Sequence, residues 1–208
     1  MSRSHPKHAP ADHDILEVIR ERWSPRAFDL AREITRGDLH RLFEAARWAP
    51  SSFNEQPWRF VVADRQRTPE TFAGLYTSLD RSNQVWASTA PVLILVAVNL
   101  RLARTGDLNR SAWYDTGQAV GFLALQATAL GVAIRQMEGF DSDRARAACG
   151  VPESFDPAVV MAVGYPGDPE SLAAEHHRAA ERQPRSRQPI GEFVFEGRWG
   201  VPIPLQSP

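Results

Sequence analysis

The chain has 208 residues, of which 43% are hydrophobic and 24% charged, and these values fit a single folded domain with its own apolar core. Its 24 basic and 25 acidic side chains give a formal charge of -1, so the balance excludes a nucleic-acid or membrane surface as the main partner. Cys149 is the only cysteine, which excludes an intrachain disulfide and a cysteine cage for a metal.

The first eleven residues are polar and contain two prolines. Residues 1–11 are expected to form a flexible tail, residues 12–200 a single domain, and residues 201–208 a second tail. The most apolar runs, 91–100 and 119–134, are interpreted as buried core elements, because the first is too short to span a bilayer and Gln126 interrupts the second. Together with the lone cysteine, this pattern predicts a cytoplasmic protein.

The first predicted helix begins near Asp14. Asp14 and Glu17 have the spacing of a capping box, in which each residue accepts a backbone N–H of the other. The apolar residues that follow would share one helical face; they are Ile15, Leu16, Ile19 and Trp23.

A second helix is predicted from Thr35, which forms a capping box with Asp38, as far as Trp48. Residues 58–64 predict a short strand, and Thr68 followed by proline predicts the start of a third helix. The repeated apolar positions of the second helix would face the core; they are Leu39, Leu42, Phe43 and Ala46.

The second half of the domain contains the most apolar elements. Residues 91–99 predict a strand covered on both faces, and residues 111–130 predict the longest helix, ended by Gly131. This helix carries almost no charge after Asp115, so we expect it to be buried on all sides, with a second subunit supplying one of them. Alternating helices and strands without a repeat indicate an α+β or α/β layered domain.

The remaining elements are shorter. Ser142 is expected to cap a helix that ends at Gly150, and residues 158–166 predict another buried strand. Residues 169–183 are interpreted as a solvated helix or loop. The late apolar residues around Trp199 are expected to lie on a partner subunit.

The common catalytic fingerprints are absent from the sequence. It contains no glycine-rich dinucleotide loop, no phosphate-binding P-loop, no nucleophile elbow and no zinc-binding helix. The spacing of the six histidines matches no metal site, so no metal ligands are assigned. Cys149 has no neighbouring base and is interpreted as a buried structural thiol.

Two arginine clusters remain. The first holds Arg20, Arg22 and Arg26 around Ser24, and the second holds Arg182, Arg185 and Arg187 around Ser186. Each cluster alone has the composition of a solvated basic loop. Taken together with the serines and amides of residues 49–60, they match what a flavin mononucleotide presents, because guanidinium forks and hydroxyl groups bind a phosphate monoester.

Six stretches carry a resemblance to the FMN-dependent nitroreductase family over residues 14–200. They are "RWSPRAF" (22–28), "ARWAPSSFNEQPWRFVV" (46–62), "SNQVWASTAPVLILV" (82–96), "DTGQAVGFLALQATALGVAIRQMEGFD" (115–141), "VGYP" (163–166) and "PRSRQP" (184–189). The resemblance implies an α+β fold, a three-layer sandwich with a central, mainly antiparallel sheet. It also implies an intertwined homodimer with FMN in two interface clefts.

The resemblance assigns roles residue by residue. Arg22, Ser24, Arg185 and Arg187 would hold the phosphate, and Arg26 would reach the phosphate side or the N1/O2 edge of the flavin. The other subunit would contribute Pro50, Ser51, Ser52 and Asn54. Asn83 would bind the pyrimidine ring, and the backbone of Met137, Glu138 and Gly139 would face the flavin N5 and O4.

Two tryptophans depart from the family pattern. Trp23 occupies the centre of the first motif, where many relatives have a smaller residue, and it is included among the cofactor-binding residues. Trp86 stands where many relatives have a basic residue. If one cation is missing there, Arg26 would stabilise the reduced flavin more nearly alone.

The resemblance implies a ping-pong oxidoreductase without a catalytic acid or base among its side chains. NAD(P)H would be a transient donor, and a nitroaromatic, quinone or similar electron-poor molecule would be the acceptor. Two alternatives stay open: the same fold with dehalogenase, azoline oxidase or flavin-fragmenting chemistry, and a non-catalytic flavin-binding dimer whose slot is closed by Trp23 or Trp86.

Overall fold

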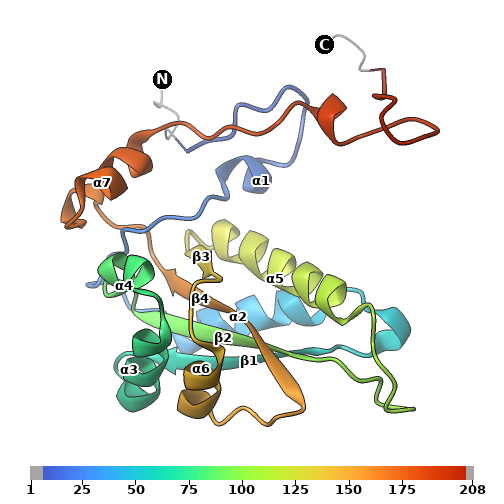
Figure 1. Cartoon of the computed structure of the whole chain (residues 1–208). Coiled ribbons are helices and arrows are strands. Elements are labelled where there is room, and N and C mark those ends of the chain that lie inside the picture. The colour runs from blue at the N-terminus through green and yellow to red at the C-terminus, as the bar shows by residue number, and fades with distance from the viewer. Residues whose placement is uncertain (1–6, 205–208) are drawn as a thin grey trace.

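The computed structural model describes residues 7–204, and its centre is one antiparallel sheet of four strands (Figure 1). In spatial order the strands are β1 (Trp58–Asp64), β2 (Val92–Asn99), β4 (Phe155–Gly164) and β3 (Ala133–Met137). Each neighbouring pair is antiparallel. The sheet confirms the predicted α+β fold with a central antiparallel sheet.

Strand β2 lies inside the sheet, and its residues from Val92 to Val98 are all buried. Successive side chains of a strand point to opposite faces, so an uninterrupted apolar run serves two cores at once. Leu93 and Leu95 belong to the core on one face, whereas Ile94 and Val96 belong to the core on the other. The expectation of a strand covered on both faces is confirmed.

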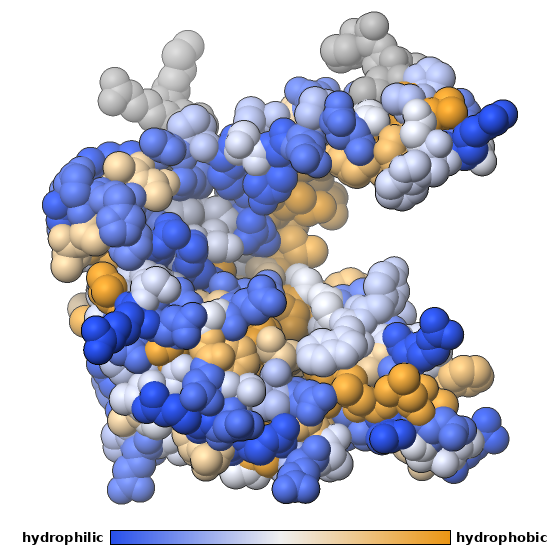
Figure 2. Space-filling model, in the orientation of Figure 1, coloured by the Kyte–Doolittle hydropathy of each residue, from blue (hydrophilic) through white to orange (hydrophobic). Residues whose placement is uncertain are grey.

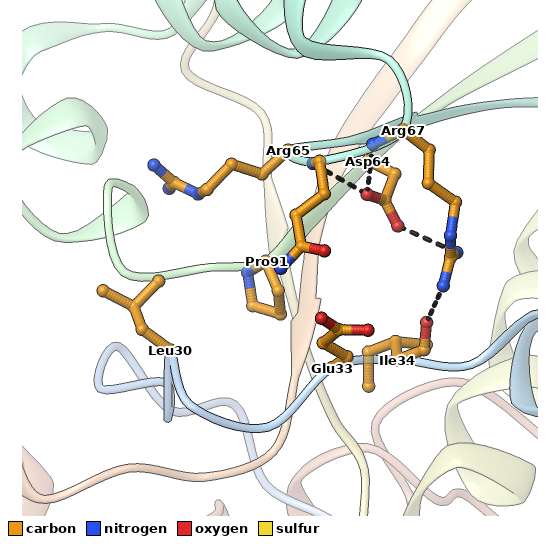
Figure 3. A pocket seen from close by; sticks show the side chains of 8 residues that line it. Leu30, Glu33, Ile34, Asp64, Arg65, Arg67 and Pro91 are labelled. Atoms are coloured by element: carbon orange, nitrogen blue, oxygen red, sulfur yellow. Dashed lines mark hydrogen bonds and ion pairs between the residues drawn. The ribbon is translucent and has the colours of Figure 1, made fainter.

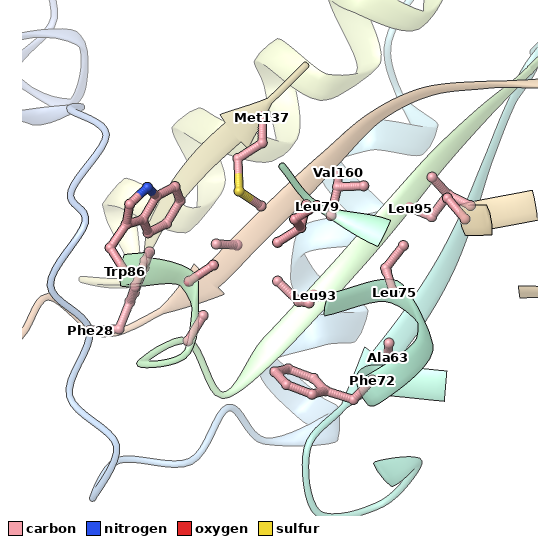
Figure 4. Packing of buried hydrophobic residues seen from close by; sticks show 14 of the residues in the cluster. Phe28, Ala63, Phe72, Leu75, Leu79, Trp86, Leu93, Leu95, Met137 and Val160 are labelled. Atoms are coloured by element: carbon pink, nitrogen blue, oxygen red, sulfur yellow. The ribbon is translucent and has the colours of Figure 1, made fainter. Parts of the chain in front are cut away.

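Helices cover both faces of the sheet and make three layers. One core packs beneath α3 (Pro69–Ser78), α4 (Arg81–Ala87) and α6 (Ser142–Cys149), and Figure 4 shows Trp86 and Met137 inside it. The other core packs beneath α2 (Arg36–Arg47) and α5 (Ala112–Ala129). This is the predicted three-layer arrangement.

Local signals fixed several helix ends as expected. At the start of α2, the Asp38 N–H donates to Thr35 Oγ1 at 3.0 Å and the Thr35 N–H donates to Asp38 Oδ2 at 3.3 Å. Both halves of the predicted capping box are therefore present. After α5, Gly131 has a φ of 71°, the left-handed conformation that ends a helix at little cost for glycine.

The first helix differs from its prediction. Helix α1 (Glu17–Glu21) is one turn long and Leu16 stands at its N-cap without a side-chain hydrogen bond. The Asp14–Glu17 capping box is wrong, because the Glu17 carboxylate pairs with His8 Nε2 at 2.7 Å instead. The expected apolar face does not pack on the chain's own core, since Leu16 is 70% exposed and Trp23 lies beyond the helix.

The cap of α6 also differs. The Arg144 N–H donates to the Asp141 carboxylate at 3.0 Å, so Asp141 and not Ser142 is the N-cap. A carboxylate at this position adds a favourable interaction with the helix dipole, which a serine does not. The helix ends at Gly150, with a φ of 63°, as expected.

The two terminal segments leave the sheet and lie together as an arm. We call residues 7–26 and 175–204 the arm, and residues 27–174 the body. The C-terminal part follows η2 (Pro169–Ser171) and contains α7 (Glu175–Arg182) and η3 (Ile190–Glu192). Figure 1 shows both segments above the body, and Figure 2 shows the molecule hollowed between the C-terminal segment and the face that carries α5.

The predicted tails fall partly outside the described residues. Residues 1–6 of the first and 205–208 of the second lie outside them. Within the first tail, the Ala9 N–H donates to the carbonyl of Arg20 at 2.9 Å, and Lys7 Nζ donates to that of Ala180 at 2.5 Å. Among the residues described, no helix combines the length and apolar content needed to cross a membrane.

Candidate functional site

The loop between α2 and β1 has the most unusual backbone of the chain. Phe53, Asn54 and Gln56 have φ values of 52°, 57° and 46°, and they are the only non-glycine residues with positive φ in residues 7–204. Each such residue carries a conformational cost of order 1 kcal/mol, so the surrounding contacts must hold the loop in place. Strained backbone of this kind clusters at binding and catalytic sites.

Contacts to α5 and within the loop supply that support. The Ser52 N–H donates to Asp115 Oδ2 at 3.0 Å, and Asp115 is only 3% exposed in the first turn of α5. The Gln56 N–H donates to Ser51 Oγ at 3.1 Å. Pro50 and Asn54 are exposed beside Phe53, whose side chain is 88% exposed. Asp115 is a positioning residue that sequence analysis missed.

The first arginine cluster is held by the second. The Arg185 guanidinium donates to the carbonyls of Arg20 and Arg22, although the two segments are more than 160 residues apart in sequence. Arg22 Nη1 donates to Ser24 Oγ at 3.1 Å. The structure therefore brings together Arg22, Ser24 and Arg185, three of the residues predicted to bind phosphate.

The charges in this cluster are of one sign. Burial and the neighbouring charge of Arg187 lower the pKa of Arg22, and burial together with Arg22 and Arg187 lowers the pKa of Arg185. No carboxylate of the described residues contributes to either shift, and Arg185 Nε is buried without a hydrogen-bond partner among them. Cations crowded in this way are expected where an anion binds.

An open pocket of about 670 Å³ adjoins the cluster, and Ser186, Arg187, Gln188 and Phe193 line it. The Arg187 side chain is exposed and donates only to the carbonyl of Ser186, at 2.7 Å. Its remaining N–H groups face solvent, so a ligand phosphate can reach them.

Arg26 faces a carboxylate that the sequence pattern did not reveal. Its backbone N–H donates to Glu181 Oε1 at 3.1 Å, and its Nη1 lies 3.8 Å from the same oxygen. Glu181 belongs to α7 and is buried, and this burial raises its pKa in spite of Arg26, Lys7 and Arg135. Trp23 is half-buried, with Lys7 Nζ 5.8 Å from its ring centre.

The segment after β3 is held in place by two hydrogen bonds to the backbone carbonyl of Gly139. Asn83 Nδ2 donates to the carbonyl of Gly139 at 3.1 Å, and the Asp80 N–H donates to the same oxygen at 3.0 Å. A Cβ at Gly139 would lie 2.6 Å from Asp80 Oδ2, so a larger residue there would displace the Asp80 carboxylate. Met137 is buried in the core, whereas Glu138 is exposed.

The predicted residues therefore fall into three groups. Arg22, Ser24, Arg26, Arg185 and Arg187 meet in the arm; Asn83 and Gly139 meet beside β3; residues 50–54 contact the start of α5. In Figure 1 the last group lies at the end of α2, on the opposite side of the view from α7.

Trp86 lies in the core beneath α3, α4 and α6. It is 2% exposed within the core, and the Arg135 guanidinium lies 5.2 Å from its ring centre. Arg135 Nη1 also donates to the carbonyl of Ser24 at 2.7 Å. Arg135 and Glu181 thus both contact the backbone of residues 24–26, and sequence analysis singled out neither of them.

A small pocket of about 30 Å³ lies away from these groups, and Figure 3 shows it. Asp64 and Arg67 close it with an ion pair of 2.9 Å, and Arg67 Nη2 donates to the carbonyl of Ile34 at 2.9 Å. The polar groups that line this pocket bond to one another, and its volume would hold about one water molecule. We interpret it as the inside of a structural turn and not as a ligand site.

Two further features of the described residues concern metals and thiols. No group of three or more His, Cys, Asp or Glu side chains in residues 7–204 is placed to hold a metal ion. Cys149 is half-buried, and burial raises its pKa to about 11. The thiol is therefore protonated at neutral pH, as a structural cysteine would be.

Comparison with known proteins shows which family and which solved structures the chain resembles. The model of the nitroreductase family matches residues 19–165. A Mycolicibacterium smegmatis protein, named as an uncharacterized 15.4 kDa protein, is 36% identical over 156 residues, which cover 70% of this chain and 99% of that protein. A Thermus thermophilus protein named NADH dehydrogenase is 29% identical over 167 residues, which cover 65% of this chain and 78% of that protein. A crystal structure described as an oxidoreductase containing FMN matches at a TM-score of 0.86 and 31% identity, covering 97% of this chain and 100% of that one.

Proposed function

Because the chain belongs to the nitroreductase family, we propose that it is an FMN-dependent oxidoreductase that carries electrons from NAD(P)H to an electron-poor acceptor such as a nitroaromatic or a quinone. The observation that carries the proposal is the convergence of Arg22, Ser24 and Arg185: the Arg185 guanidinium donates to the carbonyl of Arg22, and Arg22 Nη1 donates to Ser24 Oγ at 3.1 Å. The FMN of a solved structure that is 31% identical and the NADH dehydrogenase name of a relative support the cofactor and the donor.

The residues present fit the phosphate end of FMN. Arginine forks bind phosphate oxygens through pairs of N–H groups, and a serine hydroxyl adds a further donor. Arg22 and Ser24 already contact each other at 3.1 Å, and Arg185 has a buried Nε without a partner in the part of the chain described. Burial lowers the pKa of Arg185, and the charges of Arg22 and Arg187 lower it further. A dianion bound among these groups would offset the repulsion between them.

When bound, FMN supplies the ring position that accepts a hydride and returns electrons to the acceptor. The chain's own contribution is orientation. Asn83 and the Asp80 N–H hold the carbonyl of Gly139, so the backbone at Glu138 and Gly139 has a fixed direction beside the proposed ring position. No side chain is assigned as acid or base, so the chain would act by orienting the cofactor and its partners. Arg26 is held in the arm by its contact with Glu181.

We propose a homodimer, in which the loop of Pro50, Ser51, Ser52 and Asn54 completes the site of the second copy. Exposed aromatic side chains on α5 and the arm support it, because single chains seldom expose such large apolar patches. Trp113, Tyr114 and Phe122 are exposed on α5, and Trp199 is 89% exposed in the arm. These surfaces border the hollow that Figure 2 shows.

The burial of Trp86 bears on the non-catalytic alternative. A side chain with 2% exposure that packs within the core is not available to fill a flavin slot. The binding-only interpretation then depends on Trp23 alone. The structure thus favours an open site over one blocked by Trp86.

An absorption spectrum of the purified protein tests the proposal. We expect flavin bands that bleach when NADH or NADPH is added anaerobically, and that return when a quinone follows. Bands that do not bleach would favour a flavin binder or another donor. A colourless protein that takes up no added FMN would overturn the proposal.

A further inference from the structure

Arg135 is a half-buried arginine that neither the sequence pattern nor the family match connects with the cofactor. It belongs to β3, and its Nη1 donates to the carbonyl of Ser24 at 2.7 Å. Its guanidinium packs against the ring of Trp86, with 5.2 Å to the ring centre. Burial and the charge of Arg26 lower its pKa to about 10.

Glu181, on helix α7, also binds the backbone of residues 20–26. Its Oε1 accepts the Arg26 N–H at 3.1 Å, two residues after the carbonyl that Arg135 holds. Glu181 lies on α7, four residues before Arg185, which itself donates to the carbonyls of Arg20 and Arg22. The backbone from 20 to 26 is therefore fixed at four points by three charged side chains.

These contacts set where the anion-binding side chains point. Arg22 has an extended backbone, with φ of -60° and ψ of 118°, and alternate side chains of an extended segment share one side. Arg22 Nη1 reaches Ser24 Oγ at 3.1 Å, so the two residues do converge. A rotation of the segment at Ser24 would separate them.

Resting on the proposed function, we propose that Arg135 and Glu181 are positioning residues for the phosphate site, a clamp that holds residues 22–26 so that Arg22 and Ser24 converge with Arg185 on one anion. Buried charged groups contribute little to stability when compared with apolar residues of similar volume. Their contacts with the backbone of residues 24 and 26 give these two side chains a role other than stability, because they fix the direction of the neighbouring anion-binding groups.

The test compares FMN with riboflavin, which has the same ring system and lacks the phosphate. Apoprotein of the full chain is titrated with each ligand, for the wild type and for Arg135→Gln. We expect Arg135→Gln to weaken FMN binding by roughly tenfold, the effect of one lost charge-assisted hydrogen bond, and to leave riboflavin binding unchanged. Arg135→Lys keeps the charge and should recover part of the FMN preference.

Glu181 provides a second pair of variants. Glu181→Ala removes the acceptor of the Arg26 N–H and should lower the FMN preference, whereas Glu181→Gln keeps an oxygen there and should preserve it. Arg146→Gln is the matched control. Arg146 also donates from a half-buried guanidinium to a backbone carbonyl, that of Pro152 at 2.6 Å, but it lies on α6.

Each result has a defined meaning. A fall in FMN binding alone supports the clamp. Equal losses for FMN and riboflavin, or no loss for either, would overturn it, as would the same fall in Arg146→Gln. A wild-type protein that binds riboflavin as tightly as FMN would instead overturn the phosphate site in the proposed function, and the clamp with it.

Discussion

The body and the arm are stabilised by different interactions. In the body, strand β2 is buried on both faces, and Leu93 has no exposed surface at all. In the arm, arginine, lysine and glutamate side chains bind backbone groups, while Leu16 and Trp199 are 70% and 89% exposed. Apolar burial supplies most folding stability, so we expect most of the chain's stability to come from the body. The arm instead leaves charged groups and aromatic rings exposed.

Replacing a leucine by alanine in each region should give the largest difference in unfolding free energy between them. Leu93→Ala removes a fully buried side chain from the core in Figure 4 and should destabilise the protein by about 2–5 kcal/mol. Leu16→Ala in the arm should change the unfolding free energy by less than about 0.5 kcal/mol in the monomer. Urea unfolding of dilute protein measures both.

A large loss in Leu16→Ala would contradict the contrast, because it would mean that α1 is buried in the folded unit. Repeating the measurement at high protein concentration separates the two sources of burial. A loss that appears only at high concentration would assign Leu16 to contacts between copies.

In the arm, removal of a charged group should change FMN affinity and leave stability unchanged. Arg187→Ala removes an exposed guanidinium beside the phosphate site and should weaken FMN binding by about 1.5–3 kcal/mol, roughly ten- to a hundredfold. The melting temperature of the apoprotein should not change, because Arg187 makes only one hydrogen bond within its own segment. Fluorescence titration with FMN measures the first effect, and calorimetry of the apoprotein the second.

Arg198→Ala is the matched control, an exposed arginine of the same arm. It should leave FMN affinity unchanged. If both variants weakened binding equally, the effect would come from the net charge of the arm and not from a site.

Helix α5 joins the two regions, and Gly121 on its exposed face distinguishes a monomer from a dimer. A Cβ at Gly121 meets nothing within 4 Å in the single chain. Gly121→Leu should therefore stabilise an isolated chain by about 1 kcal/mol through helix propensity. In the proposed dimer the same side chain would overpack the contact, and the stability should fall by about 1–3 kcal/mol.

Thermal unfolding measures whether Gly121→Leu is more or less stable than the wild type, and sedimentation measures whether it still associates. A more stable and still monomeric variant would remove α5 from the proposed interface. A less stable variant with weaker association would place the second copy on this face. Gly106→Leu is no control here, because its φ of 76° adds strain of its own.

Local signals predicted the body well. The Thr35–Asp38 capping box, the apolar run of β2 and Gly131 each depend on near neighbours in the sequence, and each element formed where it was expected. Prediction was wrong for α1, since the competing partner of Glu17 is His8, nine residues earlier. The spacing of the residues allows the Glu17 carboxylate to bind either the Asp14 N–H or the His8 ring, and it does not indicate which of the two forms.

The site was predicted in part. Arginine and serine clusters identified the groups that the structure brings together in the arm, Arg22, Ser24 and Arg185. Arg135, Glu181 and Asp115 were missed, because each acts on a segment more than 60 residues away and stands in an ordinary strand or helix. A lone charge within an apolar element, such as Asp115 in α5, was the one available signal.

The smallest expected effect concerns Glu181, the buried carboxyl group that links the two segments of the arm. Burial raises the pKa of Glu181 above its ordinary value of 4.5, outweighing Arg26, Lys7 and Arg135. The folded chain thus binds this proton more tightly than the unfolded chain, so the group's contribution to stability is present below the ordinary pKa and is lost as pH rises through the raised one. Glu181→Gln stays neutral, and its unfolding free energy relative to wild type should rise with pH from mildly acidic to neutral solution. Urea unfolding across that range measures the difference, with Glu175→Gln, an exposed carboxylate of the same helix, as the control. A difference that falls with pH would mean that the charged carboxylate stabilises the fold, and the arm would then share the body's role.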